Sequence, residues 1–287
     1  MPQLNLPLNP NEVWNAVKAG SALADTPVEL LVAGSPENAG VAGQKLAAQD
    51  TDVQSFVNIS GEIPSTAGPD TVVLALVSMQ EEEPLRPSLA RVQWPAGGVV
   101  VVLGDHREGP GITWFADRVA RVGIREGESW ERVWEALVWA AGGRAVPLAR
   151  RFPVLREAAA RRLIANTCLQ NAAVGAVLFV PGTDLAVMTL NQMRLILNIA
   201  GLYGHEVGKD RLLELGSVLG AGLGFRAVAR QAVGLVPGLG WAVKGGMGYA
   251  GTKAVGEAAL RYFQHGAPLA VHTLQGRATA LVRRLRS

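Results

Sequence analysis

The sequence predicts two domains: an α/β three-layer domain in residues 1–146 and an all-α helical domain in residues 147–287. In the first part, short segments that are apolar throughout alternate with helical segments, as in parallel sheets covered on both faces. From residue 147 the chain changes to apolar, Gly-rich segments of helical character. The charge changes too: residues 1–150 carry 11 Lys and Arg against 18 Asp and Glu, whereas residues 151–287 carry 16 against 6.

Each element of the first domain follows from its local pattern. Apolar runs predict strands at Val28–Ala33, Val53–Asn58, Thr71–Val77 and Val99–Leu103. Helices are predicted at Asn9–Ala19, from Pro36 to about Ala48, between the last two strands, and at Trp130–Ala141. The last of these helices is amphipathic, and we expect its Trp130 and Trp134 to pack in the core instead of forming a ligand platform.

The centre of the second domain is the segment from Leu163 to Gly204, whose only charges are Asp184 and Arg194. It predicts two apolar helices joined by a tight turn at Pro181–Asp184. A membrane span needs about 20 mostly apolar residues. The continuous apolar part of the first helix, Ala172–Val180, has only nine. We therefore expect a buried helical hairpin, or one that dips into a leaflet, instead of two full crossings.

Further along, glycine spacing and basic residues predict helix contacts and a surface helix. Gly216, Gly220 and Gly224 recur every four residues, which favours close helix packing. The segment Val236–Gly238 repeats the Val-Pro-Gly of the first turn and indicates a second, related hairpin. The tail, Ala270–Arg286, is predicted to be a basic amphipathic helix, a type that binds anionic membrane surfaces.

A phosphate loop is the first chemistry to consider, because the strand Val28–Ala33 ends at Gly34 and opens a helix. Against the Walker pattern G-x-x-x-x-G-K-[ST], the chain has Ala39 for the second glycine, Gly40 for the lysine and Val41 for the magnesium-binding hydroxyl. The strand order suggests a GTPase-like sheet, but phosphoryl transfer depends on that lysine and on magnesium. We therefore predict a degenerate phosphate loop without NTP hydrolysis and expect no bound nucleotide.

Other patterns of catalysis or metal binding are weak in this sequence. His106 stands beside Asp105, but both are expected to be solvated on a loop. The remaining histidines lack metal-ligand spacing, and the single cysteine, Cys168, fits a small core residue. The N-terminus lacks the features of a secretory signal, which favours a cytosolic start. We expect no enzymatic activity, no cofactor and no metal.

A series of short motifs runs in a consistent order between about Pro147 and Gly266. They are Ala149–Pro153, Leu163–Ala165, Asn171–Ala172, Val180–Asp184, Gln192–Met193, Ile199–Gly204, Gly220–Gly222, Phe225–Arg226, Val236–Trp241 and Tyr249–Thr252. In these motifs the chain resembles the bacterial domain-of-unknown-function family 697, the helical domain attached to many Era-like GTPases and found in YcjF-type membrane proteins. The resemblance implies a membrane-associated helical domain coupled to a GTPase-like one, with no assigned activity.

The second domain offers seven candidate structural or functional positions: Asn171, Asp184, Gln192, Arg194, Arg226, Pro237 and Thr252. Asp184 has two interpretations. It caps the helix that begins beside it, with Thr183 as a competing cap, or it is a carboxylate paired with Arg194 or Arg226 in a membrane or interface. We favour the cap. Pro237 and Thr252 are predicted first as turn and packing residues.

Together these features predict a non-catalytic, membrane-associated anchoring or interaction protein at the cytoplasmic face of the bacterial membrane. The basic second domain suits a lipid surface or an acidic protein face. Nucleic acid is not expected, because the basic residues are not interleaved with aromatic ones. Two alternatives are open: a soluble cytoplasmic helical adaptor or self-associating scaffold, and a GTPase-like nucleotide-binding switch with an unorthodox phosphate loop.

Overall fold

The computed structural model describes residues 26–47, 57–105, 112–116, 118–177, 183–205 and 240–265. These residues group into two compact units, one through Arg162 and the other from Leu163 onward. Several predicted features lie outside the described residues: the helix at 9–19, the turn at 181–182, the glycine series at 216–224, the Pro237 turn and the basic tail at 270–286.

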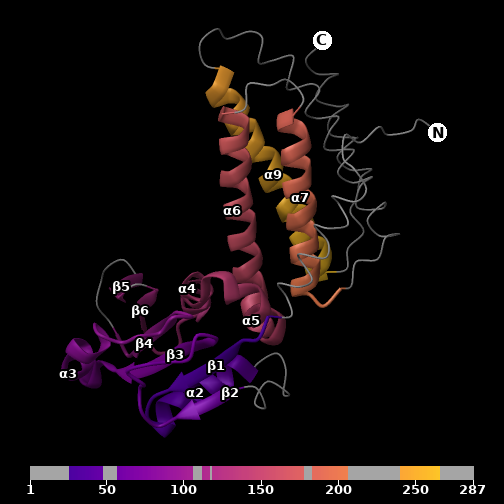
Figure 1. The fold of residues 1–287 in the computed structure, drawn as a ribbon. Coiled ribbons are helices and arrows are strands. Elements are labelled where there is room, and N and C mark those ends of the chain that lie inside the picture. Colours follow the sequence, from indigo (N-terminus) through magenta and orange to yellow (C-terminus); the bar gives the residue numbers. More distant parts are fainter. Residues whose placement is uncertain are drawn as a thin grey trace. The chain divides into compact units, whose positions relative to one another are not determined.

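The first unit is built on a six-stranded sheet (Figure 1). Its strands are β1 (Glu29–Ala33), β2 (Val57–Ser60), β3 (Thr71–Ser78), β4 (Gly98–Leu103), β5 (Ile112–Ala116) and β6 (Val119–Ile124). Their spatial order is β2-β1-β3-β4-β6-β5, and all neighbours are parallel except β5 and β6. The predicted strands at Val28–Ala33, Thr71–Val77 and Val99–Leu103 correspond to β1, β3 and β4, the one predicted at Val53–Asn58 overlaps β2 at residues 57–58, and β5 and β6 were not predicted. The α/β prediction is confirmed.

Helices cover this sheet because its central strands are apolar on both sides. The helices that contact the strands are α2 (Pro36–Ala47), α3 (Met79–Leu89) and α4 (Glu131–Ala141). Helix α5 (Ala145–Arg151) packs on α4, and α6 (Arg156–Val177) follows, with short 3₁₀ turns at Gly142–Arg144 and Pro153–Leu155. Residues 72–77 of β3 and 98–102 of β4 are all buried. Every second residue of each strand faces the same side, so both faces of the sheet are covered. Trp130 is buried, as predicted, and packs against half-buried Trp134, with ring centroids 5.3 Å apart and ring planes tilted by 43°.

The second unit packs three helices together: the rest of α6, α7 (Thr183–Leu202) and α9 (Gly240–His265) (Figure 1). Glycines of α9 set the closeness of the contacts. A Cβ on Gly248 would lie 2.5 Å from the backbone oxygen of Asn171, and one on Gly256 would lie 2.6 Å from Ile164. The later contact in α9 meets the earlier residue of α6, so the two helices run antiparallel. The all-α prediction for this part is confirmed.

Within the described ranges, none of the helices is both long and apolar enough to cross a membrane. Helices α6 and α7 lie where the two apolar helices were predicted, although α6 begins at Arg156, before the apolar stretch.

Candidate functional site

The carboxyl edge of the sheet is the first place to look for a ligand site. The parallel strands follow a doubly wound order, and ligands of such sheets bind outside the carboxyl ends of the strands where the order reverses, here between β1 and β3. Gly34 follows β1 with φ +145°, and a Cβ there would lie 2.5 Å from the backbone oxygen of Leu76. Only glycine allows β1 to leave the sheet so close to β3.

A carboxylate of the protein lies at this edge. Glu81 accepts hydrogen bonds from the backbone N–H of Ser78 at 2.7 Å and from Nδ2 of Asn38 at 3.2 Å. Ser78 in turn caps α3 and accepts from the N–H of Glu81, which completes a capping box. The hydrogen bond from the Ser78 backbone holds the pKa of Glu81 below its ordinary value. A negative charge therefore links α2 to the start of α3 where a polyphosphate would need positive groups.

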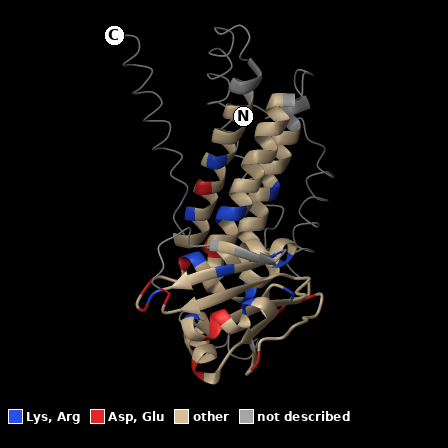
Figure 2. Ribbon diagram, turned by 90° about the vertical axis from the view of Figure 1, so that its left-hand side faces the viewer, with Lys and Arg blue, Asp and Glu red and all other residues tan. Residues whose placement is uncertain are grey.

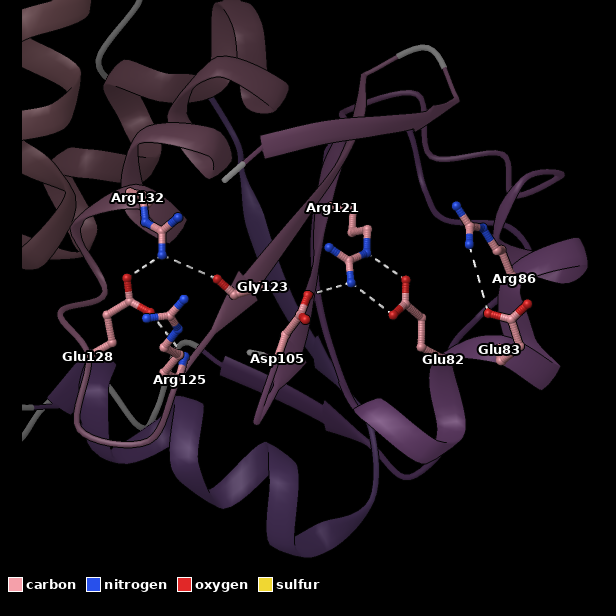
Figure 3. Close-up of polar contacts among 9 residues, drawn as sticks. All are labelled: Glu82, Glu83, Arg86, Asp105, Arg121, Gly123, Arg125, Glu128 and Arg132. Atoms are coloured by element: carbon pink, nitrogen blue, oxygen red, sulfur yellow. Dashed lines mark hydrogen bonds and ion pairs between the residues drawn. The ribbon is translucent and has the colours of Figure 1, made fainter. Parts of the chain in front are cut away.

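Beside it lies a buried ion network that the sequence did not reveal (Figure 3). The guanidinium of Arg121, on β6, donates to both oxygens of Glu82 at 2.5 and 2.8 Å and to Asp105 at 2.6 Å. Glu82 is fully buried and Asp105 is nearly so. The hydrogen bond to Glu82 is the main reason that the pKa of Arg121 is raised.

One sequence interpretation changes with this network. Asp105 was expected to be solvated, which is wrong: Gly123 leaves the space in which it meets Arg121, since a Cβ on Gly123 would overlap the carboxylate. Its neighbour His106 lies outside the described residues. In the Glu81–Glu83 run, only the middle residue is buried. Because a buried charge needs a partner, the network holds α3, the end of β4 and β6 together.

The second unit contains a polar cluster of a different kind, in which no member is charged. Asn171 of α6 donates to Thr252 of α9 at 2.8 Å and to the backbone oxygen of Met188 on α7 at 3.3 Å. Asn191 donates to Asn171 at 2.8 Å, and Gln192 donates to Thr252 at 3.0 Å. Asn171, Gln192 and Thr252 are buried. We call these four side chains the amide–threonine cluster; it joins all three helices.

The structure thus brings together three of the seven predicted positions, Asn171, Gln192 and Thr252. Arg194 is exposed on α7 and is not part of the cluster. Asp184 lies in the first turn of α7, but its side chain is outside the described residues, as are Arg226 and Pro237. Asn191 was missed as a site residue. Its adjacency to Gln192 gives no signal, because neighbouring helical residues point in different directions.

Charge is distributed unevenly along the three helices. No charged residue occurs in residues 166–177 of α6, 187–193 of α7 or 245–252 of α9. We call these segments the uncharged belt, and the amide–threonine cluster lies within it. In Figure 2 the helices are tan over this belt, with the blue and red segments of Lys, Arg and Glu below it. The belt still has exposed positions, including Leu169 at 62% exposure and Tyr249.

Metal and thiol chemistry find no support in the described part of the chain. The His, Cys, Asp and Glu side chains there do not gather in any group of three that could hold a metal ion. Cys168 is buried, and burial raises the pKa of its thiol, which keeps the sulfur in the unreactive protonated form.

Comparison with known proteins finds a family for the second half of the chain. Residues 148–287 match the family model described as Domain of unknown function (DUF697), in agreement with the resemblance read from the sequence motifs. Neither a curated protein nor a solved structure matches the chain. The GTPase-like character of the first unit is not confirmed, because a doubly wound sheet serves domains of many functions. The part of the chain that carries the amide–threonine cluster and the uncharged belt is a domain of the DUF697 family.

Proposed function

We propose that this protein is a non-catalytic membrane-surface protein, attached to the cytoplasmic face through its DUF697 domain. The observation that carries the proposal is the uncharged belt. Three adjacent helices expose side chains there without one charged group, while two cations, Lys253 and Arg261, and one carboxylate, Glu257, follow within four turns of α9. An apolar, polar-neutral surface bordered by cations is the arrangement that binds an anionic lipid interface.

The dimensions of the belt favour attachment to one leaflet. Its segments hold 7 to 12 residues each, or about 10–18 Å at 1.5 Å per residue. The hydrocarbon core of a bilayer is about 30 Å thick, so the belt is too short to cross it. Interfacial helices bury their apolar face only about 5–10 Å deep. Exposed Leu169 and Tyr249 are of the right size to enter that zone.

The interior of the belt also suits an apolar environment. The amide–threonine cluster joins its helices through neutral hydrogen bonds, as polar side chains do between membrane helices. The amide and hydroxyl groups of these hydrogen bonds have the same protonation state in lipid and in water, because none of them titrates in the physiological range.

For the first unit we infer a non-catalytic, degenerate GTPase-like role as an interaction surface. The support is Glu81, whose carboxylate stands at the edge where a GTPase would hold phosphate oxygens. A bound polyphosphate would have to displace or repel this charge. Millimolar GTP or ATP with magnesium is therefore expected to leave the thermal stability of the protein unchanged, since a ligand that binds the folded state must raise it.

Vesicle flotation of the full-length protein tests the proposal. Vesicles with phosphatidylglycerol are expected to carry the protein to the top of a density gradient, and vesicles of phosphatidylcholine alone are expected to carry less. In native membranes, release by a high-salt wash would support peripheral attachment, and retention through an alkaline carbonate wash would indicate an inserted hairpin.

Two outcomes would replace the proposal. Protein that stays at the bottom with both vesicle types, as a monodisperse oligomer, would be a soluble helical adaptor or self-associating scaffold. A rise in thermal stability with GTP and magnesium would support a nucleotide-binding switch.

A further inference from the structure

The C-terminal end of α4 carries an exposed indole with a guanidinium on its face. Trp139 is 52% exposed, although the helix around it is largely buried. The Cζ atom of Arg162 lies 4.7 Å from the centre of the indole ring. Nη1 of Arg162 donates to the backbone oxygens of Val138 and Trp139, which fixes the stack. The two hydrogen bonds and the cation–π contact thus hold Arg162 against the face of an exposed indole.

A second guanidinium is brought to the same helix end. Arg118 has φ +59° and is the one non-glycine residue with positive φ among the described residues. Its Nη1 donates to the backbone oxygen of Pro95 at 3.1 Å. Its Nη2 lies over Gly142, the residue that ends α4, where a Cβ would overlap it. Arg118 thus has an unfavourable backbone conformation. Its side chain lies against Gly142, which has φ +60°.

The two guanidiniums have no anionic partner within the described ranges. Neither makes an ion pair there, and only Nη1 of each donates to the protein. Burial, and then the positive charge of Arg118, lower the pKa of Arg162, so the two cations act on each other. The C-terminus of α4 carries a partial negative charge of about half an elementary charge, which offsets only a part of the two positive charges. The carbonyl oxygens of α4 occupy Nη1 of Arg162, and that of Pro95 occupies Nη1 of Arg118. Among the described residues, Nε and Nη2 of both side chains have no hydrogen-bond acceptor.

We propose that Arg118 and Arg162, beside Trp139, form a binding site for a phosphate group. A guanidinium presents donors in a planar fork that matches two oxygens of a phosphate. Two such forks at one helix end supply both the charge and the donors, and the indole provides an apolar wall for the group that carries the phosphate. Its source is either a lipid headgroup or a phosphate free in solution. The proposal does not rest on membrane attachment, because it names chemistry of the first unit alone.

The full-length protein labelled with 5-fluorotryptophan gives a direct test by ¹⁹F NMR. Trp139→Phe identifies the resonance of Trp139 by its loss. Inorganic phosphate, added at constant ionic strength, is expected to shift that resonance in a saturable manner. Arg118→Gln is expected to weaken the affinity about tenfold or more, as loss of a charge-assisted bond does. Arg118→Lys keeps the charge but loses the planar fork of donors. Its affinity for phosphate should therefore lie between those of the unaltered protein and of Arg118→Gln.

The matched control is Arg91→Gln, which removes an exposed arginine of the same unit and should leave the shift unchanged. Vesicles of phosphatidylglycerol form the second arm. A response to inorganic phosphate supports a site open to free phosphates, whereas a response to vesicles alone supports a lipid headgroup; in both cases Arg118→Gln must reduce it. If neither probe gives a Trp139 shift that depends on Arg118, the proposal is overturned. Vesicle flotation can succeed or fail independently of this result.

Discussion

The two units of this protein bury polar groups in opposite ways. In the first unit, Arg121 is enclosed with the carboxylates of Glu82 and Asp105. In the second, the amide–threonine cluster joins three helices with neutral groups. Both tie together elements far apart in the sequence. A charged network is strong only while every partner is present, and a neutral one loses less when a member is removed. The DUF697 domain thus holds its helices together without any buried charge in this cluster, which fits a domain that meets lipid.

The largest effect is expected from breaking the charged network. Arg121→Met would leave two buried carboxylates without their guanidinium, and breaking a buried ion pair costs about 3–5 kcal/mol. Urea unfolding followed by tryptophan fluorescence measures it, because six of the seven tryptophans precede residue 147. Arg91→Met, at an exposed position, is the control. A loss below about 1 kcal/mol would mean that the network contributes little.

The neutral cluster should yield a smaller loss. Asn171→Leu keeps most of the volume but removes the amide that donates to Thr252 and to the backbone oxygen of Met188 and that accepts from Asn191, whereas Gln192 can still donate to Thr252. Leaving buried polar groups unsatisfied costs about 1–3 kcal/mol. Urea unfolding followed by circular dichroism at 222 nm reports on the helices. The control, Asn166→Leu, changes an exposed residue of the same helix. If both variants unfold alike, the cluster does not hold the helices together.

The smallest effect is a pH dependence that separates the units. Hydrogen bonding lowers the folded-state pKa of Glu81 below its ordinary value near 4.5. Its stabilisation is therefore full above that value and is lost as the pH falls through the lower folded-state pKa. Glu81→Gln should cost about 0.3–1 kcal/mol at pH 7, the range for a charge at a helix terminus, and nothing at the acid limit. The Asn171→Leu cost should stay constant over the same pH series. A Glu81→Gln cost that does not change with pH would contradict the assignment.

The sequence was sufficient for features that repeat along the chain. Apolar runs located β1, β3 and β4, and the shift to Gly-rich helical segments predicted the second domain. The strand β6 was missed because Arg121 and Gly123 interrupt its apolar pattern and Arg118 directly precedes it, whereas β5 (Ile112–Ala116) contains none of these residues and was missed all the same. Arg121 and Gly123 belong to the ion network, and Arg118 belongs to the site beside Trp139. A local sequence pattern does not predict a strand where its residues make contacts with distant parts of the chain.

The candidate positions show the same limit. Asn171, Gln192 and Thr252 stood out as polar residues in apolar helices, which is a local signal. That they meet one another could not be predicted, since 81 residues separate the first from the last. Glu82 is buried because Arg121 lies beside it in the fold. The sequence of three glutamates, Glu81–Glu83, does not indicate which of them meets Arg121.

The central claim is that the uncharged belt is the surface that meets the membrane. The most direct measurement is flotation with phosphatidylglycerol vesicles of Leu169→Asp, in the belt, beside Ile59→Asp, in the first unit. Both replace a largely exposed aliphatic side chain, at 62% and 65% exposure, with a carboxylate. Leu169→Asp is expected to reduce the floated fraction at least about tenfold, because burying an unpaired charge in the interface costs more than 1.4 kcal/mol. Ile59→Asp is expected to float like the unaltered protein. Equal flotation of both variants would contradict the account.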